Sequence, residues 1–106
     1  MKDVLKLSPL TEASFYILLS LKNSKHGYGV IKEVSDMTNE RLVLAPGTLY
    51  GVLTSFTRNG IIEIIKEESF KKKKTYRITN QGLVLLGFET KRLNEMVKNA
   101  EEVLYG

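Results

Sequence analysis

Residues 45–60 read APGTLYGVLTSFTRNG, and this stretch decides the fold because both ends of a helix are marked in it. Pro46 stands near its start, where a missing N–H costs nothing, and Gly60 follows its end, where glycine commonly closes a helix. Apolar side chains recur at helical spacing on one face, which we expect to be buried. These residues are Leu49, Leu53 and Phe56, supported by Val52.

The opposite face of this helix is free of negative charge. No Asp or Glu occurs between Leu42 and Ile62, and the outward positions carry small hydrogen-bonding groups and one cation. Such a surface does not repel phosphates, its hydroxyls can bond phosphates or bases, and a glycine lets a backbone approach closely. Taken alone, the stretch fits a merely solvated helix about equally well. The DNA-binding candidates on this helix are Gly47, Thr48, Tyr50, Gly51, Thr54, Ser55 and Arg58.

Two shorter helices are expected upstream. The first should begin at Ser8, an N-cap residue followed by Pro9 at the first helical position. The second should follow the glycines of HGYGVIKEVSDMTN, at residues 26–39. A short strand is expected at residues 42–44, which read LVL. The expected inward positions of the second helix are Tyr28, Ile31, Val34 and either Met37 or Thr38.

The hydrophobic pattern changes from helical to extended after Gly60. Residues 61–66 are rich in isoleucine and residues 75–79 alternate strictly, so they predict the two strands of a hairpin. Thr79 is then the N-cap of a long final helix that should run to about Leu104. Three helices, a hairpin and a long helix predict a winged helix-turn-helix domain, mainly α with one β-hairpin. The acid-free helix would be its recognition helix.

Four consecutive lysines, Lys71, Lys72, Lys73 and Lys74, lie at the tip of the predicted hairpin. A charge run is usually a solvated loop. On a wing beside a recognition helix, however, the lysines would lie along the phosphate backbone and add salt-dependent affinity, so we interpret them as DNA contacts.

The single histidine, His26, opens the second helix. Because a metal site needs several converging ligands, we expect it to cap the helix or contact a phosphate.

The composition bounds the remaining possibilities. With 106 residues, 42% of them hydrophobic and 26% charged, the chain fits one domain with one modest core. The absence of cysteine fits a reducing, intracellular compartment, and we expect a cytoplasmic protein. The sequence shows neither an apolar run long enough to span a membrane nor a signal peptide. It contains no catalytic constellation and no cofactor or metal motif, so we expect no enzyme.

The last predicted helix carries a second strong signal. Its apolar residues follow alternating steps of three and four, a heptad seam interrupted only by Thr90. Part of the seam can pack on the domain's own core, but the helix is longer than that core can cover, so we expect it to pair with a second copy. A two-fold dimer would place two recognition helices against a pseudo-palindromic operator. The expected interface residues are Leu86, Leu93, Met96, Val97, Ala100 and Leu104.

We accordingly divide the chain into a winged-helix DNA-binding domain, residues 1–79, and a C-terminal dimerisation helix, residues 80–106, within one compact unit.

Four segments of the chain match a known pattern in order and spacing. They are LTEASFYILLSL (residues 10–21), HGYGVIKEV (26–34), APGTLYGVLTSFTRNGII (45–62) and KTYRITNQGLVLL (74–86). The most specific part is PGTLY, followed by Leu53 and the Gly60 turn. In these features the chain resembles the PadR family of bacterial transcriptional regulators. The resemblance covers nearly the whole chain, and the single C-terminal helix is similar to that of the short subfamily.

The resemblance implies a winged-helix DNA-binding domain with a C-terminal dimerisation helix, usually acting as a repressor. It implies that Tyr28, Thr48, Tyr50 and Gly51 lie near DNA and that the wing lysines contact its backbone. Some relatives sense phenolic acids, and others bind flat aromatic compounds between the helices of the dimer. A small aromatic effector is therefore a further expectation. The chain has no tryptophan, which argues against a site that sandwiches a drug between indoles. Phe88, Met96 and Tyr105 could still line an apolar pocket, although core packing is the favoured role for Phe88 and Met96.

We expect a homodimeric, sequence-specific DNA-binding repressor. The alternative is a winged-helix module that binds another protein and not DNA. That alternative would suit a neutral wing and an acidic third helix, and this chain has the reverse.

Overall fold

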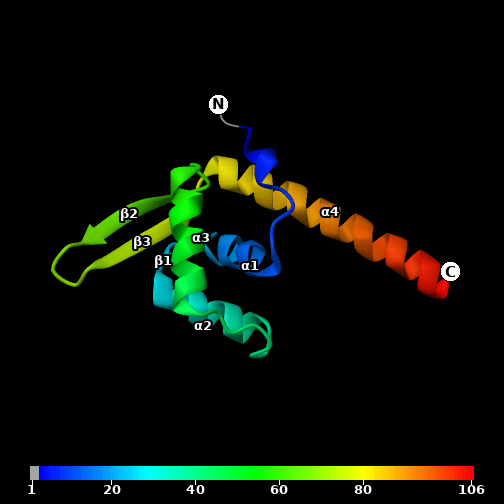
Figure 1. The fold of residues 1–106 in the computed structure, drawn as a ribbon, viewed down its shortest axis with the longest axis horizontal. Coiled ribbons are helices and arrows are strands. Elements are labelled where there is room, and N and C mark those ends of the chain that lie inside the picture. Colours follow the sequence, from blue (N-terminus) through cyan, green and yellow to red (C-terminus); the bar gives the residue numbers. More distant parts are fainter. Residues whose placement is uncertain (1–2) are drawn as a thin grey trace.

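The computed structural model describes residues 3–106, which form a winged-helix body with a long helix projecting from it (Figure 1). Its order of elements confirms the predicted fold class, mainly α with one hairpin. The elements are η1 (a 3-10 helix, Val4–Leu7), α1 (Glu12–Ser20), β1 (Lys25–His26), α2 (Gly27–Met37), α3 (Pro46–Arg58), β2 (Ile62–Glu68), β3 (Lys73–Ile78) and α4 (Asn80–Tyr105).

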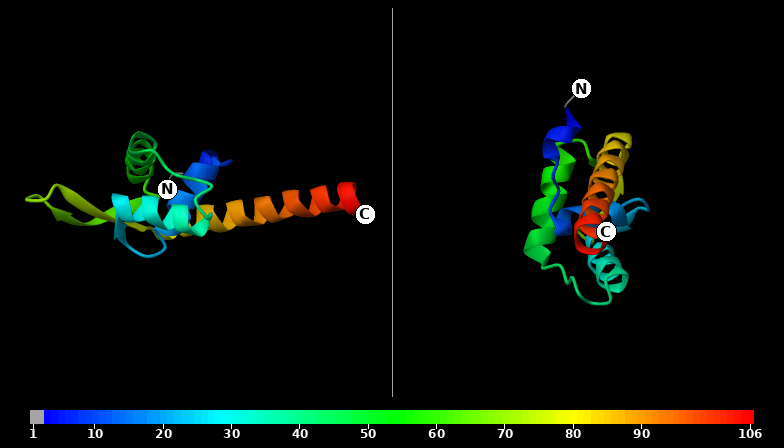
Figure 2. Two further views of the ribbon diagram at one scale, coloured as in Figure 1. Left: turned by 90° about the horizontal axis from the view of Figure 1, so that it is seen from below. Right: turned by 90° about the vertical axis from the view of Figure 1, so that its right-hand side faces the viewer.

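Two elements project from the winged-helix body on opposite sides. The β2–β3 hairpin leaves the body on one side and the distal half of α4 on the other, as Figures 1 and 2 show. Between them, α1, α2 and α3 pack with the base of the sheet and the first turns of α4 around one apolar core. The fully buried apolar side chains include Ile17, Leu18, Leu21, Val30, Val34, Leu49, Leu53, Ile61, Ile62 and Leu85.

Both predicted ends of α3 are confirmed. Pro46 is its first residue, and Gly60 follows the C-cap with a φ of +72°, a left-handed conformation that glycine adopts without steric cost. Leu49, Leu53 and Phe56 are buried, as the spacing predicted. The face of α3 that remains exposed is therefore the acid-free one.

The prediction that the first helix begins at Ser8 is wrong. The helix α1 begins at Glu12, because Thr11 is its N-cap and its Oγ1 accepts a hydrogen bond from the Ser14 N–H at 3.1 Å. The Ser8 hydroxyl is engaged elsewhere: it donates to Glu89 Oε2 on α4 at 2.7 Å. The chain before α1 consequently packs along α4 and does not extend α1.

The inward face expected for the second helix is only partly right. Val34 is buried as predicted, but Tyr28 is 70% exposed and Met37 is also exposed. The helix begins at Gly27, so the residues at i+3 and i+7 from it, Val30 and Val34, point into the core. Tyr28 therefore lies on the outer side of the first turn.

The predicted strand at residues 42–44 is absent, and a different short strand completes the sheet. Leu44 is buried in irregular chain, so its apolar character serves the core and not a strand. Instead β1 pairs antiparallel with β3, Lys25 opposite Tyr76 and His26 opposite Thr75, which gives the strand order β1-β3-β2. This pairing ties the beginning of α2 to the hairpin.

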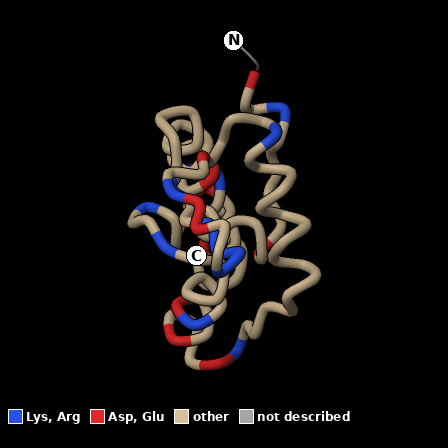
Figure 3. Tube along the Cα trace, turned by 90° about the vertical axis from the view of Figure 1, so that its left-hand side faces the viewer, with Lys and Arg blue, Asp and Glu red and all other residues tan. Residues whose placement is uncertain are grey.

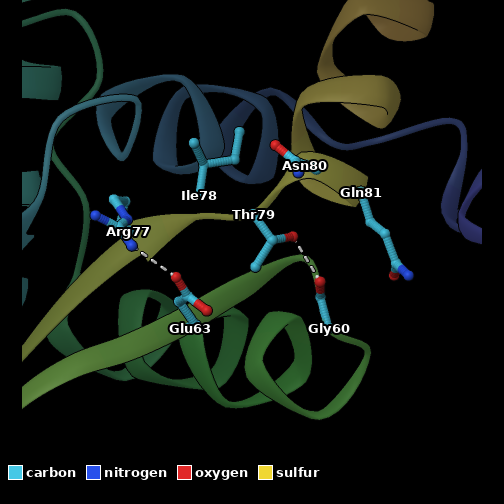
Figure 4. A pocket seen from close by; sticks show the side chains of 7 residues that line it. All are labelled: Gly60, Glu63, Arg77, Ile78, Thr79, Asn80 and Gln81. Carbon is cyan, nitrogen blue, oxygen red and sulfur yellow. Dashed lines mark hydrogen bonds and ion pairs between the residues drawn. The ribbon is translucent and has the colours of Figure 1, made fainter.

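Thr79 joins the hairpin to α4 and is hydrogen-bonded to Gly60 (Figure 4). Thr79 is the N-cap of α4, as predicted: its Oγ1 accepts from the Gly82 N–H and donates to the carbonyl oxygen of Gly60. A Cβ at Gly82 would lie 2.2 Å from the Ile61 carbonyl oxygen, so the first turn of α4 can approach the chain just before β2 only with glycine there. No helix formed by residues 3–106 is long and apolar enough to cross a membrane.

Candidate nucleic-acid interface

The seven candidate residues on α3 share one exposed surface. Gly47, Thr48, Tyr50, Gly51, Thr54, Ser55 and Arg58 are all exposed, and nothing lies within 4 Å of a Cβ built on Gly47 or Gly51. Figure 3, seen from the wing side, shows that no acidic residue interrupts the α3 trace. The candidates are, however, spread along the whole length of the helix. Arg58 is in the last turn, about 15 Å along the axis from Thr48 at 1.5 Å per residue.

Tyr50 joins α3 to the beginning of α2. The side chain is 41% exposed, and its ring lies so close to Gly27 that a Cβ there would be 2.8 Å from the phenolic oxygen. Gly27 is thus required for this contact, which explains why the first residue of α2 is a glycine despite its low helix propensity. The part of the Tyr50 side chain that stays exposed lies two residues from Thr48 on α3.

Tyr76, on β3, is a buried neighbour of Tyr50. Burial raises the pKa of Tyr76, and the neighbouring Tyr50 and Glu67 raise it further. The phenol therefore stays neutral well above neutral pH. It therefore adds no negative charge beneath the wing.

His26 links the beginning of α2 to the wing. Its Nδ1 lies 3.3 Å from the Lys74 carbonyl oxygen and 3.2 Å from the Thr75 hydroxyl. His26 is the N-cap residue of α2, but its side chain makes no capping hydrogen bond, so the first of the two expected roles is not realised. Its contacts fix the wing relative to α2 and, through Tyr50 and Gly27, relative to α3.

The wing brings most of its positive charge to its tip. Lys71 and Lys72 lie in the turn, and Lys73 and Lys74 begin β3. Lys74 Nζ is 4.0 Å from Glu67, whereas no carboxylate of residues 3–106 lies within ion-pairing distance of Lys71, Lys72 or Lys73. The positive charge that remains uncompensated is therefore at the extreme end of the hairpin.

A polar groove lies at the opposite end of the wing, where β2 and β3 meet α4 (Figure 4). It lies between Gly60, Glu63, Arg77, Thr79 and Gln81. Arg77 pairs with Glu63 at 2.9 Å, so the two charges in the groove neutralise each other. Among residues 3–106 no group of acidic or histidine side chains could hold a metal ion.

The apolar seam of α4 divides into a buried and an exposed part. Leu86 is 8% exposed and belongs to the protomer's own core, so its assignment to the dimer interface is corrected. Beyond it the same side of the helix continues in solvent, because steps of three and four residues keep these positions on one face. We call the exposed part the α4 strip; it consists of Leu93, Met96, Val97, Ala100 and Leu104.

Glu89, which the sequence analysis missed, marks the boundary between the two parts of the seam. Its side chain is fully buried and accepts hydrogen bonds from the Ser8 hydroxyl, the Leu10 N–H and Arg92, the last at 2.7 Å. The hydrogen bond from Arg92, with those from Leu10 and Ser8, lowers the pKa of Glu89 to about 2. A single glutamate on a charged helix gives no sequence signal of burial. Two of its three partners, Ser8 and Leu10, lie some 80 residues away.

Comparison with known proteins places this geometry in a family. The chain matches the Transcriptional regulator PadR-like family over residues 17–87. It is 30% identical over 92 residues to a Lysinibacillus sphaericus protein named "Uncharacterized protein X", a match that covers 85% of this chain and 78% of that protein.

Two solved structures have a similar fold. One is a transcriptional regulator from Clostridium thermocellum, with a TM-score of 0.73 and 23% identity over 99% of this chain and 100% of that one. The other is a PadR family transcriptional regulator from Eggerthella lenta, with a TM-score of 0.75 and 19% identity over 87% of this chain and 80% of that one. The chain therefore belongs to the PadR-like family, whose members are transcriptional regulators and not enzymes.

Proposed function

We propose that the protein is a homodimer that binds a pseudo-palindromic operator in double-stranded DNA and represses transcription. The observation that carries the proposal is the surface formed by the exposed face of α3, the beginning of α2 and the basic tip of the wing. It contains hydroxyls, exposed glycines and uncompensated lysines, and α3 contributes no carboxylate. A polyanion with hydrogen-bonding groups in a groove complements such a surface.

Within this surface the residues have different roles. Thr48, Tyr50 and Ser55 on α3 can donate to base edges or phosphates in the major groove, and Gly51 leaves room for close approach. Tyr28 lies exposed on the first turn of α2, in a position to contact the sugar-phosphate backbone. The wing lysines add affinity that does not depend on sequence.

The dimer is proposed from the α4 strip. Leu93, Val97 and Leu104 continue the face that packs on the core further up the helix, yet all are exposed, Val97 at 54%. An isolated apolar strip of this length is unfavourable in water. A second α4 offers the same strip in a two-fold arrangement, which covers both at once. Two copies also provide two recognition helices, as a pseudo-palindrome requires.

The part of the proposal that concerns an effector rests on a hollow beside this strip. A cavity of about 260 Å³ lies between α1 and α4, with apolar walls from Leu10, Phe15, Tyr16 and Leu93 and a guanidinium from Arg92. The apolar walls suit a small aromatic compound, and the charged groups of the lining are already paired, Arg92 with Glu89 and Glu12 with Arg41. Because Leu93 belongs to the α4 strip, a ligand there would act on the dimer and thereby on the spacing of the two recognition helices.

The experiment that tests the function is selection of binding sites from random double-stranded DNA, followed by anisotropy titrations at several salt concentrations. We expect an inverted repeat with half-sites about one helical turn apart, bound at one dimer per site. In vitro transcription from a promoter that contains the selected site then tests repression. A folded protein that binds the selected and the random DNA equally weakly would favour the alternative, a protein-binding module.

A further inference from the structure

The tip of the wing exposes an aromatic side chain. Phe70 has a relative exposure of 101%, the highest among the exposed large apolar residues, although a phenyl ring in water is unfavourable. It lies in the four-residue turn that joins β2 to β3, immediately before the lysine run. Neither the core nor the α4 strip includes it.

The turn has a defined shape that holds Phe70 at the end of the hairpin. The Lys71 N–H donates to the Glu68 carbonyl oxygen at 3.1 Å, and Glu68 and Lys73 form the last pair of the ladder. Lys72 adopts a left-handed conformation, with a φ of +51°, which returns the chain into β3. Phe70 is therefore presented outward by a hydrogen-bonded turn.

The charge around Phe70 indicates the kind of partner. Lys71, Lys72 and Lys73 follow it directly and have no carboxylate within ion-pairing distance among the residues that the structure describes. On the other side of Phe70, Glu67 and Glu68 pair with Lys74 and Lys66, so the three unpaired lysines leave the tip with a net positive charge. An apolar group on a positively charged tip fits a polyanion with an apolar interior exposed between its charges. Duplex DNA is such a partner, since its stacked bases lie between two lines of phosphates.

The reach of the wing fits the groove next to the one that α3 would occupy. Thr75 is held beside the beginning of α2 by His26, at 3.2 Å. Phe70 lies five residues beyond Thr75, a span of at most about 16 Å at 3.3 Å per residue. The centres of neighbouring major and minor grooves are about 17 Å apart, half of a helical turn of about 34 Å.

We propose that Phe70 enters the minor groove beside the major groove read by α3 and acts as an apolar wedge against a base step. The proposal rests on the proposed function, because it assumes that α3 binds DNA. A wedge of this kind partly unstacks one step and bends the duplex. The protein would then prefer an easily deformed pyrimidine–purine step, such as TA or CA, at a position where it makes no hydrogen bond to a base.

The test compares the parent protein with Phe70→Ala, Phe70→Leu and the matched control Ser69→Ala, which alters the same turn without removing the ring. The selected operator carries 2-aminopurine at each flanking step in turn, and a donor–acceptor pair at its ends reports bending. We expect enhanced 2-aminopurine fluorescence and a bend with the parent. We expect both to be lost with Phe70→Ala, retained in part with Phe70→Leu and unchanged with Ser69→Ala. The affinity of Phe70→Ala should fall roughly tenfold, the scale of one lost aromatic–base contact, with an unchanged salt dependence.

Several results would overturn the wedge while leaving DNA binding intact. One is a Phe70→Ala variant that binds and bends the operator like the parent. Another is a parent complex that shows no unstacking at any flanking step. A third is binding of the parent, but not of Phe70→Ala, to phosphatidylserine vesicles with no effect of the substitution on DNA binding, which would assign the tip to a membrane surface. A parent protein that binds no DNA would instead reject the proposed function itself.

Discussion

The helices α3 and α4 both bury one face in the same core, but they differ in what they expose. The exposed face of α3 carries hydroxyls, glycines and one arginine, whereas the exposed face of α4 carries Leu93, Val97 and Leu104. Water can hydrogen-bond to the polar groups on α3, so this face is stable in solvent and remains available to a charged partner. Water does not satisfy the exposed face of α4, which is the physical reason for the proposed pairing of two α4 helices. In the proposed function, α3 binds its partner reversibly and α4 holds the dimer together.

The largest effect is expected for a substitution in the α4 strip, because its exposed side chains are apolar and those of α3 are polar. Val97→Asp would bury a carboxylate in the proposed interface, at a cost on the order of 5 kcal/mol to dimerisation. The matched control is Lys98→Asp, the next residue, which lies away from the strip and should leave the dimer intact. Sedimentation equilibrium distinguishes monomer from dimer. An unchanged dimer for Val97→Asp would place the interface on another surface.

On α3 the buried face should respond in stability and not in binding. Leu53→Ala removes fully buried methyl groups and should lower the free energy of unfolding by about 2–5 kcal/mol. The exposed neighbour Thr54→Ala should change it by no more than about 0.5 kcal/mol. Urea titrations followed by circular dichroism measure both. Equal effects of the two substitutions would mean that the core face of α3 is assigned wrongly.

Glu89 tests where the buried part of α4 ends. The pKa of its carboxyl in the folded protein, about 2, is below the ordinary value of 4.5, so its contribution to stability is complete above about pH 4.5 and disappears as the pH falls toward 2. The difference in unfolding free energy between the parent and Glu89→Gln should shrink over this range by up to about 3 kcal/mol. Urea titrations at pH 6 and pH 3 should show about 2 kcal/mol of this change, because the carboxyl of the folded protein is still largely ionised at pH 3. A difference that is the same at both pH values would show that the charge of Glu89 does not stabilise the fold.

Tyr50 tests whether one side chain of α3 can serve both the proposed DNA-binding surface and the packing against the beginning of α2. Tyr50→Ala should weaken operator binding by roughly 1–3 kcal/mol, the scale of a lost direct contact. The side chain is 41% exposed, so the fold and the dimer should persist. Anisotropy titrations and thermal melts measure the two effects. If Tyr50→Ala unfolds the protein, its contact with Gly27 is structural and the DNA-reading role passes to Thr48 and Ser55.

The parts of the fold that local signals determine were predictable from the sequence. Pro46, Gly60 and Thr79 act on neighbouring backbone groups, so α3 and the start of α4 were predicted correctly. The errors arose where a distant residue competes for a local group. Ser8 looks like an N-cap, but its hydroxyl is taken by Glu89, 81 residues further on. Helical spacing likewise predicted a face for α4, but not that Leu86 would be covered by the core.

The candidate site shows the same division. The acid-free face of α3 and the lysine run are sequence patterns, and the structure exposes both. The contacts that fix α3 and the wing relative to each other cannot be read from the sequence. The strand β1 is two residues long and has no periodicity, and the contact between Gly27 and Tyr50 joins different helices. Phe70 could have been noted, since an aromatic residue in a polar hairpin tip has no core to enter.

The smallest effects are expected from substitutions of the wing lysines. These effects distinguish the role of the wing in DNA binding from that of α3. A lysine that neutralises a phosphate contributes to binding through released counterions, so its loss weakens binding to all sequences and flattens the dependence of log K on log salt by about one unit per contact. Lys72→Ala should show this effect, because no carboxylate of residues 3–106 pairs with Lys72. Lys74→Ala should show less, since Glu67 already lies 4.0 Å from its ammonium. Lys98→Ala, on the distal part of α4, is the matched control and should show none. Titrations of the selected operator and of random DNA over a range of salt concentrations measure all three. If Lys72→Ala weakens binding to the operator alone and leaves the salt slope intact, the wing reads bases, and the distinction between a reading helix and a positioning wing would fail.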